Sequence, residues 1–133
     1  MINIGFIGTG NNNNINKGAM KSKLKEILNW GVFVPSGTEN FNFIINNRES
    51  LGEIVDSLRE DLKVNHSIRL TKVGNINIDG TIIRESDILV MYKHDKDRLK
   101  EELKHYNRDK IVVFIEPTTY KFNTVQVKEI WKR

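Results

Sequence analysis

The sequence predicts an α/β fold in which one domain is built on a mainly parallel sheet with helices on both faces. The apolar run from Ile2 to Ile7 leads through Gly8-Thr9-Gly10 into a helical pattern, which indicates a strand, a tight loop and a helix. The runs from Ile88 to Tyr92 and from Ile111 to Ile115 are apolar throughout, as is typical of strands buried on both faces of a parallel sheet. Strand and helix patterns alternate along the chain, and right-handed crossovers then place helices on both faces.

Length and composition limit the classes of protein to which the chain can belong. Its 133 residues suit one domain, residues 1–133, and are too few for an additional substrate domain. The absence of cysteine excludes disulfides, thiolate metal sites and cysteine nucleophiles. No apolar stretch approaches the roughly 20 residues of a membrane-spanning helix. We therefore expect a soluble, cytoplasmic protein with no membrane partner.

The charge balance favours acidic small molecules over nucleic acid as partners. The chain has 21 lysines and arginines against 17 aspartates and glutamates, which gives a formal net charge of +4. The basic residues are spread along the chain, without an aromatic-basic motif or a recognition-helix pattern. We therefore expect the protein to attract anionic small molecules.

In the first half of the chain, apolar residues at helical spacing predict two helices. The first runs from about Lys17 to Asn29, and an S-x-x-E capping pattern opens the second, from Ser50 to Leu62. Between these helices, Val32-Phe33-Val34 predicts a second strand that stops at a proline. Residues Glu39 to Asn47 fit both a strand and a helix, and we favour the helix.

The second half of the chain is less regular. Alternating apolar residues predict a third strand within Val64 to Val73, and the segment Ile76 to Ile83 fits a small hairpin or an irregular crossing. A charged helix with an apolar stripe is expected around Leu99 to Tyr106, between the two buried strands. The tail from Thr118 onward fits a strand or a helix, and we favour a short terminal helix.

The loop after the first predicted strand is a candidate phosphate site. A helix that begins after such a loop points unpaired N–H groups and the positive end of its dipole toward the loop. An anionic group can bind there, and glycines let the backbone approach it. A tight turn without a ligand is the alternative interpretation of the two glycines. The candidate ligand-binding residues are Gly8, Thr9, Gly10, Asn11, Asn12, Lys17 and Gly18.

Further candidates follow the other predicted strands, because ligands bind beyond the carboxyl ends of parallel strands. These candidates are Ser36, Gly37, Thr38 and Glu39 after the second strand, Lys93 and His94 after the fourth, and Glu116 after the fifth. Lys93 and His94 can contact anionic oxygen, whereas Glu39 or Glu116 can accept ribose hydroxyls or act in catalysis. The three histidines lack metal-ligand spacing, so we expect no metal and no cofactor.

Three short motifs together resemble the SLOG superfamily of Rossmann-like nucleotide-binding domains. They are Gly8-Thr9-Gly10, Ser36-Gly37-Thr38, and Glu85-Ser86-Asp87 leading into Ile88 to Tyr92. The superfamily includes the "lonely guy" phosphoribohydrolases, DNA-processing proteins and sensor domains for nucleotide signals in prokaryotic immunity. The resemblance spans about Ile2 to Glu116 and implies a Rossmann-like domain that binds a nucleotide.

The chain departs from the catalytic members of that superfamily. The phosphoribohydrolases carry a P-G-G-x-G-T-x-x-E signature late in the fold, whereas Pro35 to Glu39 is shorter and follows the second predicted strand. A weaker resemblance to nicotinamide-dependent dehydrogenases ends at Asn13, which replaces the third glycine of G-x-G-x-x-G. These departures favour binding over catalysis.

We therefore expect a domain that senses or sequesters a nucleotide or ADP-ribose-type ligand without turnover, such as a phage protein that sequesters an immune nucleotide signal. The alternative is a nucleotide N-glycosidase of the phosphoribohydrolase kind, with Glu39 or Glu116 in catalysis. A nucleic-acid-associated domain is a second alternative. Because SLOG-like domains often pair, the resemblance also implies a homodimer or higher homo-oligomer. The candidate interface residues are Phe41, Phe43, Tyr120, Phe122 and Trp131.

Overall fold

The computed structural model is a single Rossmann-like α/β domain, as the sequence predicts. It describes residues 1–8, 16–30, 40–46, 48–62, 67–74, 76–106, 110–117 and 125–132. The strands are β1 (Ile2–Ile7), β2 (Asn40–Asn46), β3 (Ser67–Val73), β4 (Ile88–Tyr92), β5 (Ile111–Pro117) and β6 (Val125–Lys132). The helices are α1 (Lys17–Leu28), α2 (Ser50–Leu62), α3 (Ile78–Glu85), the 3-10 turn η1 (Lys93–Asp95) and α4 (Lys100–Lys104).

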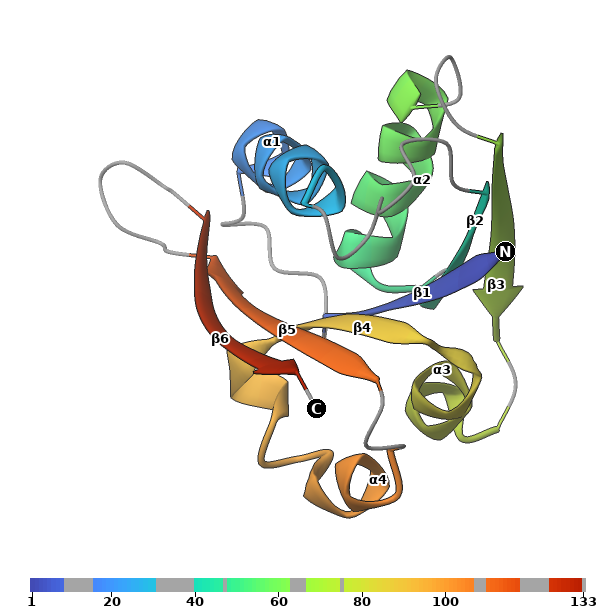
Figure 1. Cartoon of the computed structure of the whole chain (residues 1–133), viewed down its shortest axis with the longest axis vertical. Helices are drawn as coiled ribbons and strands as arrows, with labels where there is room; N and C mark the ends of the chain where they lie inside the picture. The colour runs from blue at the N-terminus through green and yellow to red at the C-terminus, as the bar shows by residue number, and fades with distance from the viewer. Residues whose placement is uncertain are drawn as a thin grey trace.

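The six strands form one sheet in the order β3-β2-β1-β4-β5-β6. All neighbouring pairs from β3 to β5 are parallel, and only β6 runs antiparallel, against β5. Helices α1 and α2 cover one face of the sheet, whereas α3 and α4 cover the other (Figure 1). The mainly parallel sheet with helices on both faces is therefore confirmed.

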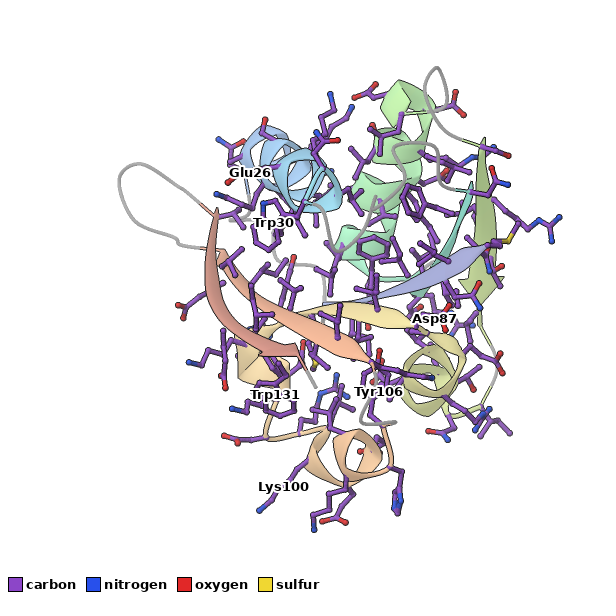
Figure 2. All side chains as sticks on the ribbon, in the orientation of Figure 1. Glu26, Trp30, Asp87, Lys100, Tyr106 and Trp131 are labelled. Atoms are coloured by element: carbon purple, nitrogen blue, oxygen red, sulfur yellow. The ribbon has the colours of Figure 1, made fainter. Side chains whose placement is uncertain are left out.

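Two apolar cores lie on the two faces of the sheet. Phe6 packs toward α1 and α2, whereas the next residue, Ile7, packs toward α3 and α4. The same alternation along β4 buries every one of its residues. Side chains fill both layers, with Trp30 near the α1 side of the sheet and Trp131 and Tyr106 on the α4 side (Figure 2).

The prediction of a helix for residues 39–47 is wrong. Asn40–Asn46 forms β2, which pairs in parallel with both β1 and β3. Phe41 and Phe43 pack on one face of the sheet, and Ile44 packs on the other. A strand that is buried on both faces shows no clear alternation of apolar and polar residues. A helical turn at these residues would have buried only one face of the helix, whereas β2 is buried on both faces of the sheet.

Two other expectations are corrected. Residues 78–85 form α3 rather than a hairpin, and Gly5 on β1 makes room for this helix, since a Cβ there would overlap Oγ of Ser86. The tail forms β6 rather than a short helix, because Val125 and Val127 pack into the α1 side of the core while the strand pairs with β5. The second strand expected at residues 32–34 lies outside the described residues.

The expected helices at residues 17–29 and 50–62 are confirmed as α1 and α2, and the third strand is β3. The charged helix between β4 and β5 is the short α4, with Leu103 buried. In the described part of the chain, every helix is too short or too polar to cross a bilayer.

Candidate functional site

The candidate site lies at the edge of the sheet where the parallel strands end, which we call the carboxyl edge. From β1 the chain proceeds outward through β2 to β3, and it then returns to β4 on the other side of β1. The crossovers on the two sides use opposite faces of the sheet, so their helices diverge at the ends of β1 and β4. Such a switch point is where open parallel sheets bind ligands.

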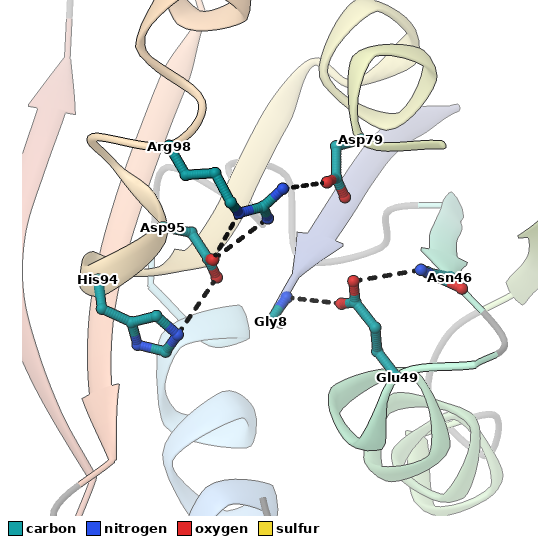
Figure 3. A network of polar contacts seen from close by, with 7 residues as sticks. All are labelled: Gly8, Asn46, Glu49, Asp79, His94, Asp95 and Arg98. Atoms are coloured by element: carbon teal, nitrogen blue, oxygen red, sulfur yellow. Dashed lines mark hydrogen bonds and ion pairs between the residues drawn. The ribbon is translucent and has the colours of Figure 1, made fainter. Parts of the chain in front are cut away.

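Glu49 occupies the turn between β2 and α2 and reaches the end of β1 (Figure 3). Its Oε2 accepts a 2.9 Å hydrogen bond from the backbone N–H of Gly8, and its Oε1 accepts a 3.2 Å bond from Nδ2 of Asn46. Asn46 is itself positioned by the N–H of Arg48, which donates to Oδ1 at 3.0 Å. Glu49 is only 9% exposed, and its two hydrogen-bond donors, the N–H of Gly8 and the amide of Asn46, are uncharged.

The environment of Glu49 changes its acidity. Burial raises the pKa of Glu49 from 4.5 to about 7, because removal from water penalises the carboxylate. The hydrogen bonds from Gly8 and Asn46 lower this pKa, and the charges of Asp79 and Asp95 raise it. Glu49 can therefore take up or release a proton near neutral pH, a property that is common at functional sites.

A network of charged side chains lies on the side of Gly8 that faces away from Glu49 (Figure 3). Asp95 in η1 is 1% exposed, and its Oδ1 accepts 3.2 Å hydrogen bonds from Nε and Nη2 of Arg98. Nη1 of Arg98 donates to Oδ2 of Asp79 at 2.7 Å. Burial of a carboxylate is costly unless a cation is hydrogen-bonded to it. Arg98 provides that cation and fixes two carboxylates from different elements.

Tyr92, the last residue of β4, lies directly against Gly8. A Cβ added to Gly8 would be 2.9 Å from Cζ of Tyr92, the atom that carries the hydroxyl. The side chain is 1% exposed, and within the described part of the chain its hydroxyl has no hydrogen-bond partner. Burial raises the pKa of Tyr92, and the charges of Glu49 and Asp95 raise it further. The hydroxyl is therefore a neutral, buried and unsatisfied group at the switch point.

A surface cavity of about 420 Å³ adjoins this network. Asn46, Asp79 and Arg98 belong both to the network and to the cavity wall. The volume falls within the range of small-molecule sites. The full lining is Asn46, Asn77, Ile78, Asp79, Arg98, Leu99 and Glu102.

The structure brings some of the residues predicted from the sequence to this edge and separates others from it. Gly8 is central to the site, and His94 lies beside it, with Nε2 3.7 Å from Oδ2 of Asp95. Lys93 points toward β6, where its Nζ is 3.8 Å from Oε2 of Glu129.

Three of the predicted site residues lie elsewhere in the described chain. Lys17 and Gly18 are exposed in the first turn of α1 and line a different cavity, of about 400 Å³, between α1 and α2. Glu116 is exposed near the end of β5, which β4 separates from β1.

The other predicted site residues lie outside the described residues, and their roles stay predictions. They are Thr9, Gly10, Asn11, Asn12, Ser36, Gly37, Thr38 and Glu39. In the described sheet, however, the strand that follows β1 in the chain and pairs with it is β2, which begins at Asn40. Residues 36–39 therefore precede β2 in the chain, and the acidic residue that follows β2 is Glu49.

Sequence reasoning missed Glu49, Tyr92, Asp95 and Arg98. Glu49 stands before a helix-capping pattern and resembles an ordinary helix start, while Tyr92 ends an apolar run and resembles a core residue. Only the correct assignment of β2 would have placed Glu49 after a strand next to β1. The Asp95 and Arg98 pair, at i,i+3 spacing, was the one local signal available.

In the described parts of the chain, no group of three or more histidine, cysteine, aspartate or glutamate residues could hold a metal ion. Comparisons with protein-family models, with curated proteins and with solved structures gave no match to the chain.

Proposed function

We propose that the protein binds a nucleotide or ADP-ribose-type small molecule at the carboxyl edge of β1, β2 and β4, and senses or sequesters it. The observation that carries this proposal is Glu49, a buried carboxyl group held against Gly8 at the switch point. Burial of a carboxyl group beside uncharged partners costs stability, so its presence at this position favours a role in binding.

The chemistry of the surrounding residues supports this class of ligand. Carboxylates such as Glu49 and Asp79 can accept hydrogen bonds from sugar hydroxyls, and the adjoining cavity of about 420 Å³ offers space for a base. His94, at the same edge, can donate a hydrogen bond to phosphate oxygen. The resemblance to the SLOG superfamily points to the same ligands, and membership of that superfamily is part of the proposal.

Equilibrium dialysis against AMP, GMP, ADP, NAD and ADP-ribose tests the proposal. We expect at least one of these ligands to be depleted from the free fraction and recovered unchanged. Glu49→Gln should weaken its binding at least about tenfold, the scale of a lost charged hydrogen bond. The matched control is Glu53→Gln. Glu53 lies four residues after Glu49, in the first turn of α2, and is exposed.

The two variants also locate the ligand. Glu53 lines the cavity between α1 and α2, so a loss of affinity in Glu53→Gln alone would move the site there. Depletion of none of the five ligands, or wild-type affinity in Glu49→Gln, would overturn the proposal.

Hydrolysis of an N-glycosidic bond is the second candidate function, and the acidity of Glu49 favours it. A general acid works best when its pKa lies near the working pH, and the pKa of Glu49 is about 7. Glu49 would protonate the departing base while water attacks the sugar carbon, and it would then regain a proton from that water. Glu49 is added to the catalytic candidates of this alternative, and Glu39, which lies outside the described residues, stays one of them.

Chromatography of the same incubations separates the two candidates. Release of a free base by the wild-type protein, abolished in Glu49→Gln while binding largely survives, would establish turnover and refute simple sequestration. Full recovery of unchanged ligand would remove the hydrolase from consideration.

A further inference from the structure

The hydroxyl of Tyr92 has no evident role in the stability of the free protein. It is buried, and in the described chain nothing donates to it or accepts from it. An unsatisfied buried hydroxyl lowers the stability of the folded protein, and phenylalanine would fill the same space without that cost. The ring itself packs into the core on the α1 side of the sheet, so packing accounts for the ring but not for the oxygen.

The position of this hydroxyl relates it to Glu49. Both side chains flank the same residue, because Gly8 donates its N–H to Oε2 of Glu49 and lies in contact range of the carbon that carries the Tyr92 hydroxyl. A phenol is a donor, and a carboxylate is an acceptor. The site thus presents one donor and one acceptor against the same glycine at the switch point.

We infer that Tyr92 and Glu49 together bind a hydroxyl group of the ligand's sugar, so that the protein selects ribose over deoxyribose. This inference rests on the proposed function. A ligand hydroxyl accepts from Tyr92 and donates to Glu49, and it satisfies both groups at once. A phosphate would be repelled by the carboxylate, and an ammonium group has no lone pair for the phenol.

The burial of both side chains has a kinetic consequence. Glu49 is 9% exposed and Tyr92 is 1% exposed, so a ligand reaches them only after neighbouring groups at the carboxyl edge have moved. Binding that requires such a change associates more slowly than simple docking does.

The first arm of the test needs no ligand. Tyr92→Phe removes the unsatisfied oxygen and should raise the melting temperature by about 3 °C or more. The matched control is Tyr106→Phe on the opposite face, where the hydroxyl donates to the backbone oxygen of Ile111 at 3.4 Å. That control should leave the melting temperature unchanged or lower it. Destabilisation by Tyr92→Phe would show that the hydroxyl is satisfied in the free protein, and the inference would fall.

The second arm compares AMP, GMP and ADP with their 2′-deoxy and 3′-deoxy counterparts by equilibrium dialysis. For a ribonucleotide that binds, removal of one of the two hydroxyls should weaken binding at least about tenfold, because a buried donor and acceptor are then left unpaired. Tyr92→Phe should lose affinity for the ribonucleotide and reduce the discrimination to a few-fold, whereas Tyr106→Phe should keep both.

The outcomes of the two arms are separable from a failure of the proposed function. If a ribonucleotide binds but both deoxy forms bind equally well, the inference about Tyr92 is wrong and the proposed function stands. If no nucleotide of the dialysis panels binds, the proposed function fails and the inference fails with it.

Discussion

At the scale of single residues, Glu49 links the stability of the fold to pH. The pKa of Glu49 is about 7 in the folded protein, whereas that of an unfolded glutamate is 4.5. Between these values the folded state binds more protons than the unfolded state, so the free energy of unfolding falls as the pH rises. Above pH 7 the loss is complete, and it amounts to at most about 3 kcal/mol.

Glu49→Gln should remove most of this pH dependence, because glutamine does not titrate. We expect the wild type to lose up to about 3 kcal/mol more stability than the variant between pH 5 and pH 8. Urea unfolding of both proteins at the two pH values measures the difference, and Glu53→Gln, on an exposed position, should behave like the wild type. Equal losses in the wild type and Glu49→Gln would show that the folded protein does not raise this pKa.

The side chains of the site also show why sequence alone found only part of it. Gly8 was identified because its loop pattern is local. Its partner Glu49 is 41 residues away and comes close only through the parallel pairing of β1 with β2. The unsatisfied Tyr92 hydroxyl likewise depends on what surrounds it in space, and no local pattern of residues encodes that.

At the scale of elements, the start of α2 is what positions Glu49. Gly52, in the first turn of α2, packs against the end of β2, and a Cβ there would overlap the backbone oxygen of Asn46. The helix can approach the strand this closely only because residue 52 has no side chain. The turn that carries Glu49 is therefore fixed by a backbone contact.

Gly52→Ala should push α2 away from β2 and destabilise the protein by about 1 to 3 kcal/mol. Gly18→Ala is a suitable control in the first turn of α1, since among the described residues its Cβ would meet only Oδ1 of Asn16, at 3.4 Å. Alanine is the better helix former, so this control should be neutral or stabilising by up to about 1 kcal/mol. Thermal or urea unfolding distinguishes them, and equal stability of the two variants would contradict the packing described for α2.

Elements with a strong periodic pattern were predictable, and those defined by pairing were not. The helix α2 combines a capping pattern with regular apolar spacing, and its bounds of Ser50–Leu62 match the prediction. In β2, Phe41, Phe43 and Ile45 alternate as in a strand, whereas Phe41, Ile44 and Ile45 fit a helical turn. Burial on both faces of the sheet decides for the strand. The strand β6 is defined by its pairing with β5, which no local pattern in the tail reveals.

At the scale of the whole molecule, the surface available for self-association differs from the one that the sequence implied. Phe41 and Phe43 are buried in the core of a single chain, and Trp131 packs on Phe114 with ring centroids 4.8 Å apart. Tyr120 and Phe122 lie outside the described residues. The strand β6 instead ends the sheet and exposes 47% of Ile130. Edge strands carry unpaired backbone groups that can pair with another chain.

We expect the protein to form a dimer at micromolar concentration through the β6 edge, and Ile130→Glu to shift it toward the monomer. The charge would be desolvated in the interface but remains in water on the free edge. Sedimentation velocity on both proteins, with and without added ADP-ribose, measures the change. A strictly monomeric wild type under both conditions would refute self-association, and a dimer unaffected by Ile130→Glu would place the interface elsewhere.

We expect the ligand to bind at the switch point, against Gly8 and Glu49. Titration of the ¹⁵N-labelled protein with the tightest-binding ligand of the dialysis panel, followed by nuclear magnetic resonance, tests this location. The backbone amide of Gly8 and the side-chain amide of Asn46 both donate to Glu49, so their resonances should shift and saturate together as the ligand replaces or reorients that carboxyl group. Gly18, in the cavity between α1 and α2, should not shift. Saturating shifts at Gly18 and its neighbours, with Gly8 and Asn46 unchanged, would contradict the assignment of the site.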